Sequence, residues 1–230
     1  MLLEKERCKL FNEELLFLYN EIDELVSILR ERTGLACESS CRNCCRTPSR
    51  NIEVSILELL PLAEYLFEKG IAEYWMDKLD GTSDNDFCVL FEESPTNQPK
   101  GGCRFYGLRP LVCRLFGFSA VVRKDGSVAP VLCSILKKSH LRSVFSALSE
   151  MIVKIPIMSE YANRVYCLDP YLSSMSYPIN TALKKAIEYS GYRILISREA
   201  ASDTVLQISL QDSGQLLGGF EDVGNSVKVV

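Results

Sequence analysis

The residues in this sequence that could do chemistry are its cysteines. Four of them fall within nine positions on a polar stretch: Cys37, Cys41, Cys44 and Cys45. Clustered soft donors among polar neighbours are typical of a thiolate metal site, whereas an isolated cysteine usually behaves as a small apolar residue. A second, more widely spaced group follows: Cys88, Cys103, Cys113 and Cys133. These eight thiols are the candidate metal ligands.

The composition favours reduced thiols over a disulfide framework. The chain has 230 residues, of which 47% are hydrophobic, and this supports a core without covalent staples. It begins MLLEKERCKL, which lacks the apolar core of a signal segment, and no apolar run is long enough to span a membrane. We therefore expect a cytoplasmic protein with no membrane partner. The net charge of −4 also argues against nonspecific nucleic-acid binding.

Around the second group the order of residues is distinctive. The string Cys103-Arg-Phe-Tyr106-Gly-Leu-Arg109-Pro110-Leu-Val-Cys113-Arg114 comes after the Cys-Cys pair, a Ser55-to-Glu58 helix start and the lone Cys88. In this order the chain resembles the YkgJ-type cysteine-cluster family, also called the CxxCxxCC family of zinc- or iron-chelating domains. The resemblance covers about residues 37–133. One departure is that three residues, not two, separate Cys37 from Cys41.

The resemblance implies zinc or iron, and the spacing bears on the choice between them. Zinc ribbons usually show two Cys-x-x-Cys pairs, but only Cys41 and Cys44 have this spacing here. We also expect the adjacent Cys44 and Cys45 to point in different directions, which is awkward for a single ion. An iron–sulfur cluster held by distant loops, of the 4Fe-4S type, is therefore the preferred cofactor, and zinc is the alternative. Eight thiols indicate two sites, or one site with spare thiols.

Three other residues of the string are candidate cofactor-binding residues: Tyr106, Arg109 and Arg114. A four-thiolate site carries negative charge, which the two arginines are placed to offset by hydrogen bonding. Pro110 is expected to begin a helix with Cys113 in its first turn. The positive end of that helix would lower the thiol pKa of Cys113.

Three functions remain open on this basis. The first is a metal-cluster binding protein with a redox, sensing or metal-handling role. A protein partner is compatible with this role. The second is an S-adenosylmethionine-dependent protein or lysine N-methyltransferase related to flagellin lysine N-methylase, although the sequence has no Gly-x-Gly-x-Gly loop. The third is a structural zinc module for partner binding. The sequence assigns no catalytic residue and leaves open whether the protein is an enzyme.

A radical S-adenosylmethionine enzyme is a further interpretation, because Cys37, Cys41 and Cys44 have that spacing. That family usually has an aromatic residue where this chain has Asn43, and it needs a strand before the cysteines and βα units after them. The sequence predicts a long helix before them and no such alternation.

The elements that must position the thiols are mostly helical. Apolar residues at three- and four-residue spacing predict one helix over residues 1–32, and the Ser55–Glu58 capping box begins another, followed by a short helix over 71–79. The sequence also predicts helical structure over 134–165 with a break at Pro156, and a helix over 178–189.

Strands are expected in two places. Asp125-Gly126 predicts a hairpin with a two-residue turn, in which Lys124 pairs with Ser127 and Cys133 lies opposite Phe118. Residues 193–196 and 205–211 also read as strands.

The predicted fold class is α+β and mainly α-helical. It has a long N-terminal helix, a central cysteine-rich metal-binding module with a β-hairpin, and C-terminal helices and short strands. The expected division is residues 1–34, 35–140 and 141–230, or one domain overall.

Overall fold

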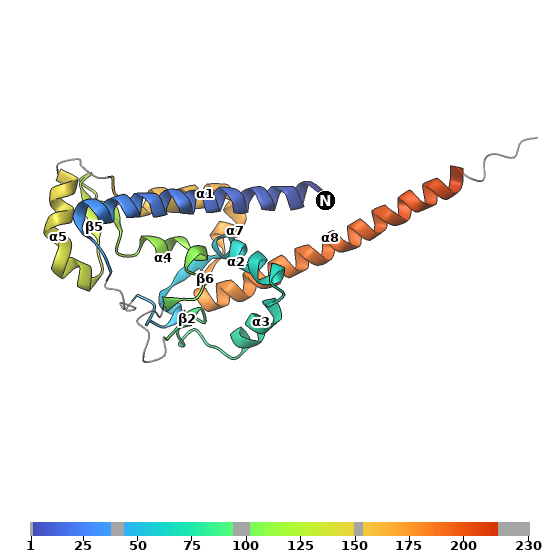
Figure 1. The fold of residues 1–230 in the computed structure, drawn as a ribbon, viewed down its shortest axis with the longest axis horizontal. Helices are drawn as coiled ribbons and strands as arrows, with labels where there is room; N and C mark the ends of the chain where they lie inside the picture. The colour runs from blue at the N-terminus through green and yellow to red at the C-terminus, as the bar shows by residue number, and fades with distance from the viewer. Residues whose placement is uncertain (1, 38–43, 94–101, 150–153, 216–230) are drawn as a thin grey trace, which may run out of the picture.

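A computed structural model describes residues 2–37, 44–93, 102–149 and 154–215 of the chain (Figure 1). Most of these residues are helical, and the described strands form three antiparallel pairs, β1–β6, β2–β3 and β4–β5. The predicted mainly helical α+β class is confirmed. In chain order the elements are α1 (Leu2–Thr33), η1 (Ser49–Asn51), β1 (Glu53–Ser55), α2 (Ile56–Glu68), α3 (Ala72–Asp80), β2 (Phe91–Glu92), β3 (Gly102–Cys103), η2 (Tyr106–Leu108), α4 (Leu111–Leu115), β4 (Ser119–Val122), β5 (Val128–Val131), α5 (Ser134–Ser149), α6 (Met158–Leu168), α7 (Pro170–Ser174), β6 (Ser176–Pro178) and α8 (Ile179–Gln215).

Helix α2 lies at the centre of the main core. Most of its side chains are buried, Leu57, Leu60 and Leu66 among them, because α1, α7 and the first part of α8 pack around it. The capping box that the sequence predicts is formed: the Ser55 hydroxyl accepts a hydrogen bond from Glu58 N, and Glu58 accepts one from Ser55 N. Because α2 is buried in the core, a loop that is anchored to its first turn is held in a fixed position.

Helix α1 confirms the predicted long N-terminal helix and buries the predicted stripe. Leu15, Leu18, Ile22 and Leu29 are all buried, and Gly34 ends the helix with a φ of 69°. The last turn of α1 contributes Leu29 to a second, smaller core, which also contains side chains of the β4–β5 hairpin and α5. Figure 1 shows α1 running across the body with α5 and the hairpin at one end.

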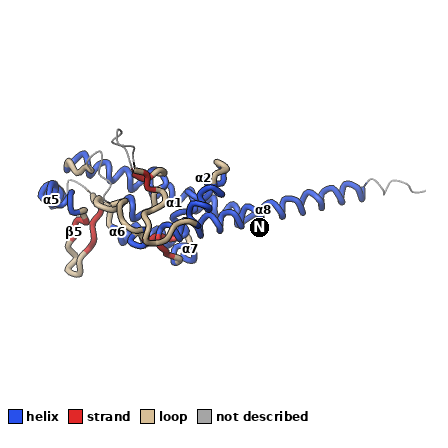
Figure 2. The backbone as a smooth tube through the Cα atoms, turned by 90° about the horizontal axis from the view of Figure 1, so that it is seen from below, coloured by secondary structure: helices blue, strands red, loops and turns tan. Residues whose placement is uncertain are grey.

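Helix α8 corrects the C-terminal prediction. Residues 193–196 and 205–211, predicted as strands, belong to one helix that begins at Ile179 and ends at Gln215. A short apolar run does not distinguish strand from helix by itself. A helix also satisfies its backbone internally, whereas a strand needs a neighbour to pair with. Figures 1 and 2 show the second half of α8 extending away from the body. Within the described residues, no helix is both long enough and apolar enough to cross a membrane.

The β4–β5 hairpin is present, but its register differs by one residue from the prediction. Val122 pairs with Val128, and Arg123 N donates to Ser127 O at 2.8 Å. The turn is therefore a three-residue loop, in which Gly126 takes a φ of 81°. In this register Gly117, and not Phe118, lies opposite Cys133. The predicted pairing of Lys124 with Ser127 was wrong because Asp-Gly suits both turn lengths.

Candidate metal centre

Six of the eight candidate thiols line one cavity of about 840 Å³. They come from four separate places: the segment just after α1, the turn before η1, the loop between α3 and β2, and the segment from β3 to α4. These six are Cys37, Cys44, Cys45, Cys88, Cys103 and Cys113. None of the eight cysteines whose side chains are described is in a disulfide. The cavity therefore presents soft sulfur donors from distant parts of the chain.

The β2–β3 pair joins the Cys88 loop to the segment that carries Cys103. Phe91 pairs with Cys103, and Arg104 N donates to Leu90 O at 2.9 Å. The buried Asn180, in the first turn of α8, completes this arrangement: its Oδ1 accepts from Val89 N at 2.9 Å, and its Nδ2 donates to Phe87 O at 3.1 Å. Asn180 thus holds the backbone on both sides of Cys88. The sequence predicted a helix start near Asn180 but not this long-range contact.

Helix α4 places Cys113 in the wall of the cavity. Pro110 lies immediately before the helix, as predicted, and Cys113 N donates to Pro110 O at 3.1 Å. The first turn is also capped from a distance, because Glu58 Oε1 accepts a hydrogen bond from Leu111 N at 2.9 Å. Burial raises the pKa of Cys113 to about 12, and the charges of Cys88 and Cys103 act in the same direction. The expectation of a lowered pKa at this helix start was wrong, because loss of hydration outweighs the effect of one short turn.

Cys44 and Cys45 bring two sulfurs close together. Their Sγ atoms lie 3.9 Å apart, so the two side chains face each other, contrary to the expectation that they point in different directions. A turn at these residues brings both side chains to one side. The hydrogen bond between the thiols lowers the pKa of Cys44 to about 6 and raises the pKa of Cys45.

Two of the predicted ligands are not placed at the cavity. Cys41 lies outside the described residues. Cys133 does not line the cavity: its Sγ accepts a hydrogen bond from Leu136 N at 3.4 Å at the start of α5, and the side chain packs against the smaller core. Among the described residues, no group of three or more His, Cys, Asp or Glu side chains is close enough to hold a metal ion.

Arg109 and Arg114, to which the sequence assigned the same role, do different things. Arg109 lines the cavity, stacks on the Tyr106 ring with its guanidinium carbon 3.4 Å from the centroid, and donates to Tyr106 O and Cys113 O. Its charge acts to lower the pKa of three cavity thiols, Cys44, Cys103 and Cys113.

Arg114 instead points into the protein. Its side chain is buried, pairs with Asp23 of α1 and donates to the carbonyl oxygens of Gly107 and Arg109. Its guanidinium carbon also lies 4.3 Å from the centroid of the Tyr19 ring. Arg114 therefore fastens the Tyr106–Pro110 segment to α1, while Arg109 faces the thiols.

The rest of the cavity wall is largely apolar and aromatic. Its side chains include Leu90, Phe91, Val112 and Phe118, beside the exposed Tyr106 ring. Two charged residues of the lining are paired with each other, since Arg104 lies 2.7 Å from Glu92. Apolar walls reduce solvation of a bound ion and so strengthen its attraction to thiolates.

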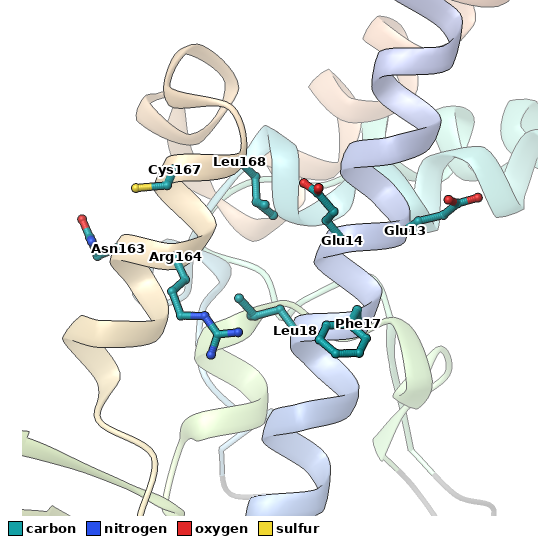
Figure 3. A pocket seen from close by; sticks show the side chains of 8 residues that line it. All are labelled: Glu13, Glu14, Phe17, Leu18, Asn163, Arg164, Cys167 and Leu168. Atoms are coloured by element: carbon teal, nitrogen blue, oxygen red, sulfur yellow. The ribbon is translucent and has the colours of Figure 1, made fainter.

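A second cavity, of about 580 Å³, lies between α1 and α6. Figure 3 shows Leu18 and Leu168 facing each other across it, with Glu14 near its edge and the Cys167 sulfur pointing away from α1. Cys167 is exposed. Cys167 is the one cysteine among the described residues that line this cavity, whereas six cysteines line the first cavity.

Comparison with known families agrees with the position of the first cavity. A family model described as "CxxCxxCC: Putative zinc- or iron-chelating domain" matches the chain from residue 36 to residue 134. Residues 36–134 match the CxxCxxCC family. This confirms the resemblance that the sequence indicated over residues 37–133. The match covers less than half of the chain, but the CxxCxxCC segment contains all eight candidate thiols. No curated protein and no solved structure matches the chain.

Proposed function

We propose that this protein binds zinc or iron through the thiolates of the described cavity. The observation that carries the proposal is the convergence of six cysteines, from four separate places in the chain, on one cavity. The donor set fits the group chemically, since thiolates select zinc, copper(I) and iron–sulfur clusters over hard cations. The match to a zinc- or iron-chelating family over the same residues supports it independently.

The ligands would come from Cys37, Cys44, Cys45, Cys88, Cys103 and Cys113, with Cys41 and Cys133 as the remaining candidates. Bound metal would supply either electron transfer, as an iron–sulfur cluster, or a structural or transferable ion, as zinc. Arg109 offsets the thiolate charge from the cavity wall. The role that follows is redox, sensing or metal handling, in a reducing compartment such as the cytoplasm.

The metal content of the purified protein distinguishes a 4Fe-4S cluster, which the sequence favours, from zinc. The full chain is purified with and without oxygen, and its visible absorbance, iron, zinc and acid-labile sulfide are measured. An iron–sulfur protein absorbs visible light and contains iron and acid-labile sulfide, whereas a zinc protein is colourless and contains neither. Protein that holds neither metal after purification, and takes up neither on reconstitution, contradicts the proposal.

Cysteine-to-serine variants test whether the metal binds in this cavity. Cys113→Ser and Cys88→Ser should lower the metal content per chain, because both residues line the cavity. Cys167→Ser is the matched control, since Cys167 lies in the other cavity. Metal lost equally in all three variants would place the site elsewhere. No observation on the described residues favours the methyltransferase alternative.

A further inference from the structure

The six thiols of the cavity differ in how far solvent reaches them. Cys37 and Cys44 are exposed, Cys45, Cys103 and Cys113 are partly buried, and Cys88 is buried. A metal carried by a chelator or by another protein can therefore contact the exposed thiols before any of the others. Exposure alone does not choose between Cys37 and Cys44.

The spacing of the Cys44 and Cys45 sulfurs favours Cys44 as the first contact for the metal. Two thiolates on one tetrahedral ion, with Zn–S bonds of about 2.3 Å, lie about 3.8 Å apart. The Cys44 and Cys45 sulfurs are already 3.9 Å apart. This pair can hold one ion from two sides without a change in the fold, and one of its two sulfurs is exposed.

The same pair leads inward. Cys45 is partly buried and lines the same cavity as Cys103, Cys113 and Cys88. Cys103 and Cys113 are also partly buried, and Cys88 is buried. Within one cavity, the exposure of the thiols therefore falls from Cys44 to Cys88.

We infer that metal enters the cavity by ligand exchange at the Cys44–Cys45 pair and then passes to the partly buried and buried thiols Cys103, Cys113 and Cys88. In each step one bond between the metal and its previous ligand breaks as one Sγ–metal bond forms. The thiol proton passes to the released ligand or to water, and no electrons are transferred. The inference rests on the proposed metal-binding function and adds the route by which the site is filled.

The test is the rate of zinc transfer from a zinc-loaded chromophoric chelator to the metal-free full chain, followed by stopped-flow absorbance. The zinc kept after desalting is measured separately. Cys44→Ser and Cys45→Ser should slow the initial transfer by on the order of tenfold or more, because the second sulfur no longer binds intramolecularly. Each of these two variants also lacks a candidate ligand, so the decisive readout is the rate of the first phase and not the final zinc content. Cys113→Ser should keep the fast first phase and lose zinc on desalting.

Cys167→Ser, an exposed cysteine outside this cavity, should behave as the wild type. Circular dichroism and urea unfolding identify any variant that does not fold, and Cys44→Ser replaces an exposed side chain. Cys44→Ser transferring zinc at the wild-type rate would overturn the inference, as would Cys113→Ser slowing the first phase equally. Wild-type protein that takes up no zinc or iron would instead overturn the proposed function.

Discussion

Glu58 and Leu111 connect the centre of the core to the helix that carries Cys113. Glu58 Oε1 accepts a hydrogen bond from Leu111 N at 2.9 Å, while Oε2 accepts from Ser55 N at 2.9 Å. One carboxylate therefore caps both α2 and α4, through a contact between residues 53 positions apart in the chain. The packing of α2 therefore fixes the position of the segment that carries Cys113.

Glu58→Ala should therefore cost more than the loss of one helix cap. A single N-cap contributes about 1 kcal/mol, so we expect the free energy of unfolding to fall by about 2 kcal/mol for Glu58→Ala and by about 1 kcal/mol for Ser55→Ala. Urea denaturation of the metal-free protein measures both. Equal losses in the two variants would show that the contact with Leu111 adds nothing.

Local signals in the sequence predicted the helices well. The stripe from Leu15 to Leu29 and the Ser55–Glu58 capping box depend on residues three or four apart, and the structure has both. The hairpin register failed by one residue, because a glycine at a turn does not distinguish two loop lengths. The strands predicted beyond residue 192 failed because nothing within a short apolar run says whether a partner strand exists.

The site could be predicted in its residue types but not in its arrangement. The cysteine spacing pointed to the thiols, and six of them line one cavity. Residue spacing does not show which side chains meet in the folded chain. It therefore could not predict that Cys44 faces Cys45, that Arg114 points inward, or that Asn180 binds the backbone beside Cys88. The pKa of Cys113 was predicted in the wrong direction because burial is a property of the folded chain.

Arg109→Gln should weaken metal binding with little effect on folding. The side chain lines the cavity and its charge acts on three thiols, so its loss leaves the thiolate charge less compensated. We expect metal affinity to fall by about 10- to 100-fold in a chelator competition titration. Arg104→Gln is the control, because Arg104 also lines the cavity but pairs with Glu92. The same loss in both variants would mean that any cavity arginine suffices.

Asp23→Ala should destabilise the fold instead. Removal of Asp23 leaves the buried guanidinium of Arg114 without its carboxylate, and such losses cost about 3 kcal/mol where the charge stays buried. We expect a fall of about 2 to 3 kcal/mol in the free energy of unfolding, with metal content unchanged in the folded protein. Glu24→Ala, at the neighbouring exposed position, should change neither quantity. Unaltered stability of Asp23→Ala would show that the carbonyl contacts of Arg114 suffice.

The contact between α1 and α6 should give a small dependence of stability on acid pH. Hydrogen bonds from Arg164, at 2.7 Å, and from Tyr161 lower the pKa of Glu21 from 4.5 to about 2. Because the folded pKa is the lower one, the stabilisation is present above about pH 4.5 and is lost as the pH falls towards 2. Partial exposure of both side chains limits it to below about 1 kcal/mol. Glu21→Gln should be less stable than the wild type at neutral pH, and the difference should shrink at acid pH.

Asn180 connects α8 to the Cys88 loop, so Asn180→Ala should loosen the backbone around Cys88. The side chain is buried, accepts a hydrogen bond from Val89 N and donates one to Phe87 O. In the variant, Val89 N and Phe87 O would lose this partner. We expect a loss of about 2 kcal/mol in the free energy of unfolding and faster hydrogen exchange at Val89 N. Thr181→Ala is the matched control: its hydroxyl donates to Asp84 at 3.1 Å, in the same loop but away from Cys88. If Asn180→Ala lowered stability without faster exchange at Val89, the clamp would serve the core rather than the Cys88 loop.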